Sequence, residues 1–242
     1  MTTRAHISKE DLRNHMQDYL VKYGFIVVTV VLFVWFAVSE ETFRMPNTIF
    51  SMLKFTSVVA IVGLGVTVAM VVGGLDLSVG AVAGLSVTLS AMTMVIYGFT
   101  GITAVIVVLV AGVGVGLFNA LLIVVLKIPD LLATLGTMFI IMGLKLLPVD
   151  GQSVSSGMTL RDGSTAPGKF TPEFLLIDRA SWGPVPFPVI LFLVLTAITW
   201  FFLTRTKWGR MMYAIGANPE AARLAGVRVR GYRALAYVIS GI

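Results

Sequence analysis

Three polar side chains stand out in the long apolar stretches of this chain of 242 residues. Asp76 is the only acidic residue in positions 42–129, Ser78 follows it by two residues, and Asn119 is the only amide in the apolar run 102–126. Asp76 or Ser78 can cap a helix that begins after a pair of glycines, because a side-chain oxygen accepts hydrogen bonds from free backbone N–H groups. The alternative is a broken helix within a membrane, whose free end and carboxylate line a route for solutes. Asn119 fits either a hydrogen bond between helices or a contact with such a solute.

A second stretch, residues 218–226, has the composition of a short capped helix between two apolar runs. Asn218 suits the N-cap, and Pro219 suits the first helical position, where no backbone N–H is needed. Glu220 places a carboxylate near the positive end of the helix dipole, and Gly226 is a natural stop. A helix of about two turns is not stable in isolation, so we expect it to pack on another surface.

The residues that most enzymes use are absent from the sequence. The chain has no Cys, no Gly-x-x-x-x-Gly-Lys-Ser/Thr phosphate loop and no Gly-x-Ser-x-Gly nucleophile motif. His6 and His15, both in the N-terminal tail, are the only histidines, and no carboxylates are spaced for an acid–base pair or a metal site. We therefore expect no catalytic residue, no metal site and no ATP site in this chain.

Composition identifies lipid as the solvent for most of the chain. Hydrophobic residues make up 57% and charged residues 12%, which is about half the charged share of a typical soluble domain. We predict an all-α polytopic transmembrane helical bundle with six complete spans, residues 24–38, 47–72, 76–97, 102–126, 131–149 and 188–203. Gly112 and Gly116, four residues apart, predict close packing between helices. A seventh span begins at Ala234 but is too short to cross a bilayer, so we expect a chain truncated at its C-terminus, with later spans missing.

Positive charge is concentrated in one segment, and this predicts the topology. Residues 205–233 contain seven basic residues and one acid, whereas residues 150–185 contain three basic residues and four acids. Short loops rich in Lys and Arg remain cytoplasmic. We therefore expect a multi-pass membrane protein with a cytoplasmic N-terminal tail (1–22), a transmembrane domain (23–242), a long loop on the opposite side of the membrane (150–187) and a cytoplasmic segment (205–233). The basic residues flank spans and lack interleaved aromatic side chains, which argues against nucleic-acid binding.

The pattern Gly216-x-Asn218-x-Glu220-Ala221-Ala222-Arg223-Leu224-x-Gly226 resembles the cytoplasmic signature of membrane subunits of ATP-binding-cassette (ABC) importers, in the ribose and simple-sugar branch. Residues 73–80, GGLDLSVG, resemble the GG-(Ile/Leu)-DLS motif of that branch, and residues 133–137 resemble its Ala-Thr-Leu-Gly-Thr stretch. Pro219 stands where an acidic or polar residue is more usual. The resemblance covers nearly the whole chain, but only the first part of a family member.

The resemblance implies the permease subunit of an ATP-driven importer for a monosaccharide or a similar small polar solute, and not an enzyme. Its coupling helix would sit in a groove of a separate ABC ATPase subunit, which binds the ATP and Mg. The matching residues are Asn218, Glu220, Ala221, Ala222, Arg223 and Gly226. A second permease subunit, forming a homodimer, and a periplasmic substrate-binding protein would complete the assembly in the membrane lipid. The resemblance thus implies a protein of the bacterial inner membrane, in which the loop 150–187 is periplasmic.

The resemblance also suggests roles for the remaining polar residues. Asp76, Ser78 and Asn119 are candidates for the translocation pathway, with Asn119 contacting a sugar hydroxyl, while Thr134 and Thr137 either cap a helix or face that pathway. The loop 150–187 is either a plain surface loop without sustained periodicity or a docking surface for the binding protein, with Trp182 and Phe187 as anchors.

Two alternative functions remain open at this point. One is an ion-coupled secondary transporter, although such proteins usually carry ionisable residues in their spans, and here Asp76 is nearly alone. The other is an ABC permease for a nucleoside or an amino acid.

Overall fold

The computed structural model describes the backbone of residues 9–242 and the side chains of residues 22–242. The chain divides into two units, residues 1–52 and 53–242. Residues 1–8 of the predicted N-terminal tail lie outside the described part.

The long helix α1 (Lys9–Ser39) forms most of the first unit and runs without a break across the predicted boundary between tail and first span. The short α2 (Glu41–Arg44) follows, and α3 (Pro46–Val71) begins within this unit. The ring centroid of Phe43 lies 5.2 Å from that of Phe33 and 5.8 Å from that of Phe36. These aromatic contacts stabilise the turn between α1 and α2.

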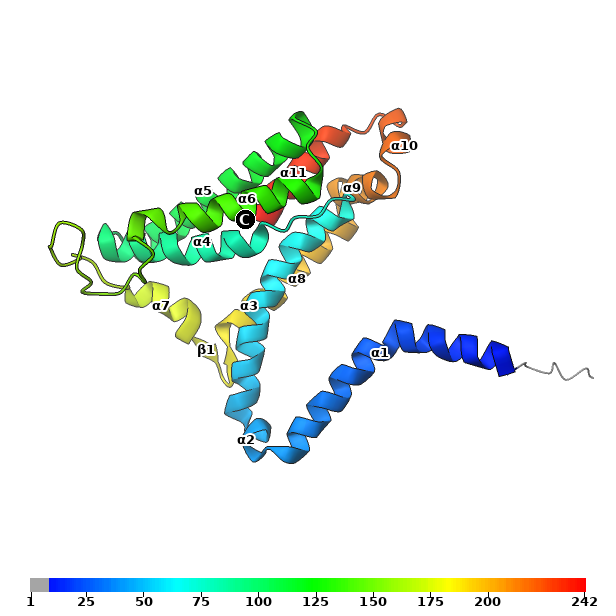
Figure 1. Cartoon of the computed structure of the whole chain (residues 1–242), viewed down its shortest axis with the longest axis horizontal. Helices are drawn as coiled ribbons and strands as arrows, with labels where there is room; N and C mark the ends of the chain where they lie inside the picture. The colour runs from blue at the N-terminus through cyan, green and yellow to red at the C-terminus, as the bar shows by residue number, and fades with distance from the viewer. Residues whose placement is uncertain (1–8) are drawn as a thin grey trace, which may run out of the picture. The chain divides into compact units, whose positions relative to one another are not determined.

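The second unit contains the rest of α3 and all later elements, with α4, α5 and α6 lying alongside one another (Figure 1). Two short π-helical segments extend α4 and α5, and a 3₁₀ turn follows α6. In chain order the elements are α4 (Val79–Ala91), η1 (Met92–Ile96), α5 (Gly101–Ala120), η2 (Leu121–Val125), α6 (Asp130–Leu144), η3 (Leu147–Val149), α7 (Pro172–Arg179), β1 (Ser181–Trp182), β2 (Val185–Pro186), α8 (Phe187–Arg205), α9 (Lys207–Ala217), α10 (Pro219–Leu224) and α11 (Val229–Gly241).

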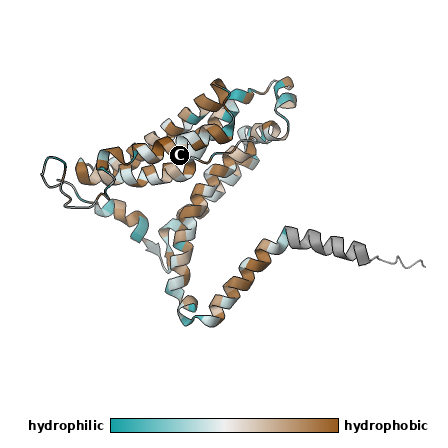
Figure 2. Cartoon of the chain, in the orientation of Figure 1, coloured by the Kyte–Doolittle hydropathy of each residue, from teal (hydrophilic) through white to brown (hydrophobic). Residues whose placement is uncertain are grey.

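Within the described residues, six helical stretches are long and apolar enough to cross a membrane. Apolar residues cover most of their length (Figure 2). The six stretches are Lys22–Ser39, Pro46–Val71, Val79–Ile96, Gly101–Val125, Asp130–Val149 and Phe187–Arg205. They match the six predicted spans, so the all-α transmembrane prediction is confirmed. The helix predicted to begin at Ala234 begins earlier, because α11 extends from Val229.

Glycine allows α5 to pack closely on α11. A Cβ atom at Gly116 would lie 2.6 Å from the Tyr237 carbonyl oxygen and from the Val238 Cα, and one at Gly112 would overlap the Gly241 carbonyl oxygen. Such distances are too short for any other residue, so the two backbones approach only because both positions lack a side chain. The predicted role of Gly112 and Gly116 in close packing is confirmed.

The segment between α6 and α8 contains more regular structure than its sequence suggested. It includes α7, which starts with Pro172, and a two-stranded antiparallel hairpin in which Gly183 has a φ of 60°. The Gly168 backbone N–H donates to the Val95 carbonyl at 2.9 Å, and the Lys54 ammonium group lies 2.7 Å from the Asp178 carboxylate. These long-range contacts order the segment, and local periodicity does not encode them.

Candidate functional site

Asp76, Ser78 and Asn119 form one hydrogen-bonded cluster. Asp76 Oδ1 accepts from the Ser78 backbone N–H at 2.9 Å and from the Ser78 hydroxyl at 2.6 Å. The Asn119 side-chain amide, on α5, donates to the Ser78 hydroxyl oxygen at 2.8 Å. All three residues are at most 1% exposed. The fold therefore brings together the three polar residues that stand out in the apolar sequence.

Two acceptors of this cluster lack a partner. Asp76 Oδ2 and Asn119 Oδ1 are buried and make no hydrogen bond to the described part of the chain. Leaving a buried polar atom unpaired costs about 1–3 kcal/mol, and a buried carboxylate costs more. Violations of this kind occur mainly at functional sites. The two oxygens are suited to accept hydrogen bonds from a hydroxyl or N–H group of a polar ligand.

The cluster lies at the break between α3 and α4. Gly73 follows the end of α3 with a φ of 75°, a conformation in which other residues are strained. Asp76 Oδ1 accepts from the local N–H of Ser78, but Ser78 is the N-cap residue and makes no side-chain hydrogen bond to the N–H groups of α4, so the predicted side-chain cap of this helix is not formed. Asp76 Oδ2 has no hydrogen-bond partner among the described residues, as the pathway interpretation requires. One oxygen of the carboxylate therefore holds the turn before α4, and the other is available to a solute.

Thr134 and Thr137 lie on α6 and are both buried. The Thr134 hydroxyl lies 2.9 Å from the Asp130 carbonyl and 3.4 Å from the Leu75 carbonyl, and the Thr137 hydroxyl donates to the Ala133 carbonyl at 3.0 Å. Neither hydroxyl caps the start of α6, because both bond to carbonyl oxygens. Thr134 instead ties α6 to the loop that holds Asp76.

The predicted capped helix is present as α10. Asn218 Oδ1 accepts from the backbone N–H groups of Glu220 at 3.1 Å and Ala221 at 3.0 Å. Gly226 ends the segment with a φ of 82°, in the left-handed region that favours glycine. The predicted N-cap at Asn218, the short helix and its end at Gly226 are therefore all confirmed.

The predicted contact residues of α10 do not share one face. Glu220, Ala221 and Arg223 are exposed, and the Arg223 guanidinium pairs with the Glu220 carboxylate at 2.8 Å. Ala222 is only 5% exposed and packs in an apolar cluster with Met212 and other side chains of its own chain. Ala222 therefore anchors α10 to the body of the protein, and the outward surface includes Leu224, which is 81% exposed.

A helix that the sequence reading missed, α9, precedes α10. The Thr206 hydroxyl caps it by accepting from the Gly209 N–H at 3.2 Å, and Met212 and Ile215, three residues apart, are fully buried. Gly216 lies against the end of α3, where a Cβ atom would overlap the Val71 carbonyl oxygen. A threonine cap followed by this apolar spacing is the signal that could have revealed the helix.

Residues 48–242 match the family model described as "Branched-chain amino acid transport system / permease component". The chain belongs to this permease family. The resemblance to ABC import permeases of the simple-sugar branch is likewise confirmed by curated relatives. These matches do not favour the ion-coupled alternative.

Three relatives illustrate the similarity of this permease to known proteins. It is 29% identical over 236 residues to the ribose import permease protein RbsC of Bacillus subtilis (strain 168), covering 98% of this chain and 70% of the relative. It is 31% identical over 222 residues to the D-allose transport system permease protein AlsC of Escherichia coli (strain K12), covering 91% of this chain and 64% of the relative. It is 34% identical over 185 residues to the autoinducer 2 import system permease protein LsrD of Klebsiella pneumoniae, covering 76% of this chain and 53% of the relative. The chain thus spans between about half and 70% of the length of these relatives. No solved structure matches it significantly.

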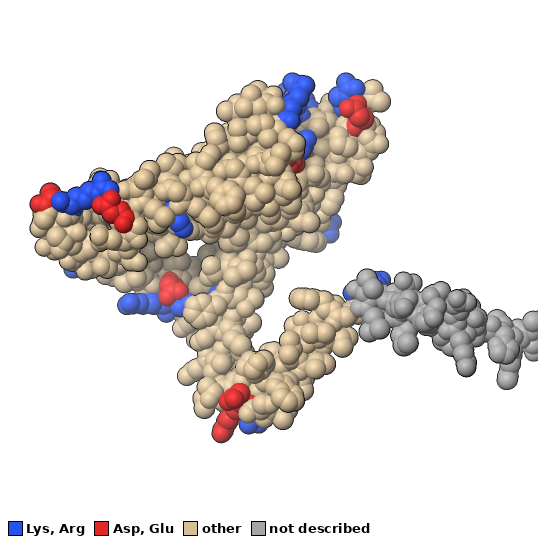
Figure 3. Space-filling model, in the orientation of Figure 1, with Lys and Arg blue, Asp and Glu red and all other residues tan. Residues whose placement is uncertain are grey.

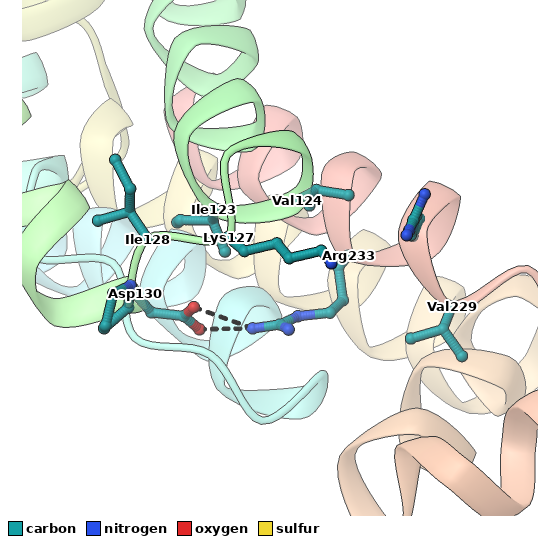
Figure 4. Close-up of a pocket in the computed structure, with 9 residues that line it drawn as sticks. Ile123, Val124, Lys127, Ile128, Asp130, Val229 and Arg233 are labelled. Atoms are coloured by element: carbon teal, nitrogen blue, oxygen red, sulfur yellow. Dashed lines mark hydrogen bonds and ion pairs between the residues drawn. The ribbon is translucent and has the colours of Figure 1, made fainter.

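The permease has a second charged cluster, which the sequence reading missed. Arg233 Nη2 on α11 donates to both carboxylate oxygens of Asp130, the first residue of α6, at 2.8 and 2.9 Å (Figure 4). The Tyr237 hydroxyl donates to Asp130 Oδ2 at 2.7 Å. No sequence signal pairs residues more than one hundred positions apart in a single chain. A pocket of about 340 Å³ adjoins the pair, with Lys127 and Arg230 among its lining residues.

Charged side chains of the second unit gather at the two ends of its α4–α6 bundle (Figure 3). Basic residues cluster around α10 and the start of α11. Asp150, Arg161 and Asp162 line a pocket together with Ile96, the last residue of η1. The Arg161 side chain donates to both Asp150 oxygens, and this hydrogen bonding lowers the pKa of the Asp150 carboxyl. Hydrogen bonds from the Ser164 hydroxyl and, to a smaller extent, from the Ser164 backbone N–H lower the pKa of the Asp162 carboxyl. Among the described residues, no three His, Cys, Asp or Glu side chains come close enough to hold a metal ion.

Proposed function

We propose that this permease is the membrane subunit of an ATP-driven importer that moves a monosaccharide, or a similar small polar solute, across the bacterial inner membrane. The names of its relatives, which include ribose and D-allose permeases, support this solute class. The relative named as an autoinducer 2 permease makes that solute a second candidate. The buried oxygens of Asp76 and Asn119 are suited to the hydroxyl groups that such solutes share.

The observation that carries the proposal is the way α10 is built. A helix of six residues is too short to persist alone, yet it is capped by Asn218, stopped by Gly226 and anchored through buried Ala222. Its outward side presents Glu220, Ala221, Arg223 and Leu224. An exposed, rigidly anchored helix at the end of a transmembrane bundle is suited to fit a groove in a partner subunit.

We infer that the partner is a separate ABC ATPase, which binds ATP and Mg and moves α10 as it closes. A second copy of the permease and a binding protein on the opposite face complete the proposed assembly. Trp182 is 81% exposed in the β1–β2 hairpin, and Phe187 is 36% exposed at the start of α8. Both are therefore accessible as anchors for the binding protein. The basic residues around α10 favour a cytoplasmic position for this end and for the N-terminus.

The test is co-purification of an ATPase with the tagged full-length permease from native membranes in mild detergents. Leu224→Arg and Ala221→Arg place a charge on the outward side of α10, and we expect ATPase recovery to fall by about tenfold or more. Trp182→Arg, at an equally exposed aromatic position on the opposite end, is the matched control and should retain the ATPase. Ala222→Trp is unsuitable as a contact variant, because Ala222 is buried in its own chain.

Either result is informative. Loss of the ATPase in the α10 variants alone, with normal thermal stability of the permease, supports the proposed contact. Absence of any ATPase with the wild-type permease in several mild detergents contradicts the ATP-driven function.

A further inference from the structure

We propose that Asp130, Arg233 and Tyr237 are positioning residues that transmit movement of α9 and α10 to the loop 73–78, which carries Asp76 and Ser78. This inference rests on the function proposed above and adds the route by which the coupling segment reaches the buried polar cluster. The route consists of contacts on two sides of the glycine pair Gly73 and Gly74.

The first contact joins α11 to the start of α6. Arg233 and Tyr237 lie one turn apart on α11, so both side chains reach the same residue, Asp130. Arg233 contributes hydrogen bonds of 2.8 and 2.9 Å to the Asp130 carboxylate, and Tyr237 contributes one of 2.7 Å. Asp130 is 19% and Arg233 30% exposed in their side chains, and Tyr237 is fully buried. Partial burial strengthens these charge-assisted bonds, so α11 and α6 move together at this point.

The glycine pair lies directly on this cluster. A Cβ atom at Gly74 would overlap the Tyr237 hydroxyl and lie 2.9 Å from Asp130 Oδ2. The backbone of the loop therefore contacts both residues at a distance that only glycine permits. Two residues further along, Asp76 binds Ser78, which in turn accepts from Asn119.

The second contact comes from α9. A Cβ atom at Gly73 would lie 3.8 Å from the Gly216 Cα, and one at Gly216 would overlap the Val71 carbonyl oxygen. Gly216 lies only two residues before Asn218, the cap of α10. A displacement of α10 therefore acts on Gly73 through α9 and on Gly74 through α11.

The charged pair has room to shift. Lys127 and Arg230 are among the residues that line the pocket beside it (Figure 4). Arg233 Nε is buried and has no hydrogen-bond partner in the described part of the chain. An incompletely satisfied guanidinium next to a cavity with both charged and apolar lining residues has space to change its contacts. The contacts of Asp130 and Arg233 can therefore differ between two positions of α10, and the loop 73–78 would adopt a different conformation in each.

The test uses the assembled transporter in proteoliposomes. Residues 1–242 contain no Cys, so Gly80→Cys introduces the only thiol of this segment beside the loop, at a position with open space around it. The readouts are the rate of N-ethylmaleimide labelling with and without ATP, and the amount of D-ribose taken up per ATP hydrolysed. Tyr237→Phe removes only the hydroxyl, and Tyr232→Phe on the same helix is the control.

We expect ATP to change the labelling rate in the parent protein and in Tyr232→Phe. In Tyr237→Phe and Asp130→Asn, two quantities should each fall by about tenfold: the effect of ATP on the labelling rate, and the amount of D-ribose taken up per ATP hydrolysed. A tenfold change is typical of the coupling between two distant sites in a protein. ATP hydrolysis and ATPase co-purification should persist, and Asp130→Glu should restore part of the coupling. A purely structural role would instead lower thermal stability and ATPase recovery together.

Three results would overturn the proposal. They are an unchanged ATP effect in Tyr237→Phe, loss of the ATPase from Tyr237→Phe, and no ATP effect in a parent complex that retains its ATPase. If Asp130→Asn does not assemble, Tyr237→Phe decides the question, because it preserves the buried ring. Failure of the proposed function is distinguishable, since then no ATPase accompanies the parent protein at all.

Discussion

The Asn119 side chain donates a 2.8 Å hydrogen bond to the hydroxyl oxygen of Ser78, which lies 41 residues earlier in the chain. This bond joins α5 to the break between α3 and α4. It also orients the Ser78 hydroxyl toward Asp76, which accepts at 2.6 Å. The amide of Asn119 in an apolar helix and the polar break at Asp76 and Ser78 thus belong to one site.

Asp76→Asn separates the local turn contact of this residue with Ser78 from its proposed pathway role. Asn retains an oxygen that can accept from the Ser78 N–H, so the free energy of unfolding should change by less than about 1 kcal/mol. It loses the negative charge, so solute uptake should fall by about tenfold if the free oxygen contacts the solute. Thermal unfolding in detergent and D-ribose uptake in proteoliposomes measure the two effects. Normal uptake together with normal stability would show that Asp76 only stabilises the turn before α4.

Gly116→Ala should destabilise the contact between α5 and α11. The added methyl group would lie 2.6 Å from the Tyr237 carbonyl oxygen, and forcing such a contact apart costs about 1–3 kcal/mol. Gly114→Ala is the control, because a Cβ there has nothing within 4 Å and Ala is the better helix former. Melting temperatures of the two variants should therefore move in opposite directions, and equal melting temperatures would contradict the close packing.

Gly226→Ala should loosen the end of α10. Its φ of 82° is left-handed, which costs a residue with a side chain about 1–2 kcal/mol. Hydrogen exchange of the backbone amides in residues 220–225 should accelerate. Gly231→Ala, at a helical position with nothing within 4 Å of its Cβ, should leave this exchange unchanged. Unaltered protection in Gly226→Ala would show that the stop is not needed.

The segment around Asp150 should lose its ordered structure at acidic pH, and its structure should not change with pH near neutrality. Hydrogen bonds from Arg161 lower the folded pKa of Asp150, and those from Ser164 lower that of Asp162. A depressed carboxyl pKa contributes stability that is present above the unfolded pKa of about 3.9 and is lost as pH falls through the lower folded pKa. Limited proteolysis of residues 150–165 by an acid-active protease should therefore accelerate below about pH 4 and stay constant from about pH 5 to 8. Arg161→Gln should remove much of this dependence, and an unchanged profile in that variant would contradict the assigned cause.

Much of the fold and the local form of α10 depend on local properties of the sequence. Spans are set by the length and apolarity of a run, which is a local property, so all six were predictable. The cap at Asn218 and the stop at Gly226 were equally local, because each depends on one side chain or one backbone conformation. Asp76 and Asn119 were recognisable as polar exceptions in apolar surroundings, but nothing local showed that they share a site.

The contacts between residues distant in the sequence depend on the packing of the folded chain. Whether Asp130 pairs with Arg233, and whether Ala222 faces inward or outward, depends on how helices pack against one another. In a membrane, many helix faces are apolar, so hydropathy does not distinguish a face toward lipid from a face toward protein. The contacts of α11 with α5, α6 and the loop at Gly74 therefore follow from packing at glycines and from satisfying a few buried polar groups, which become visible only when the chain is folded.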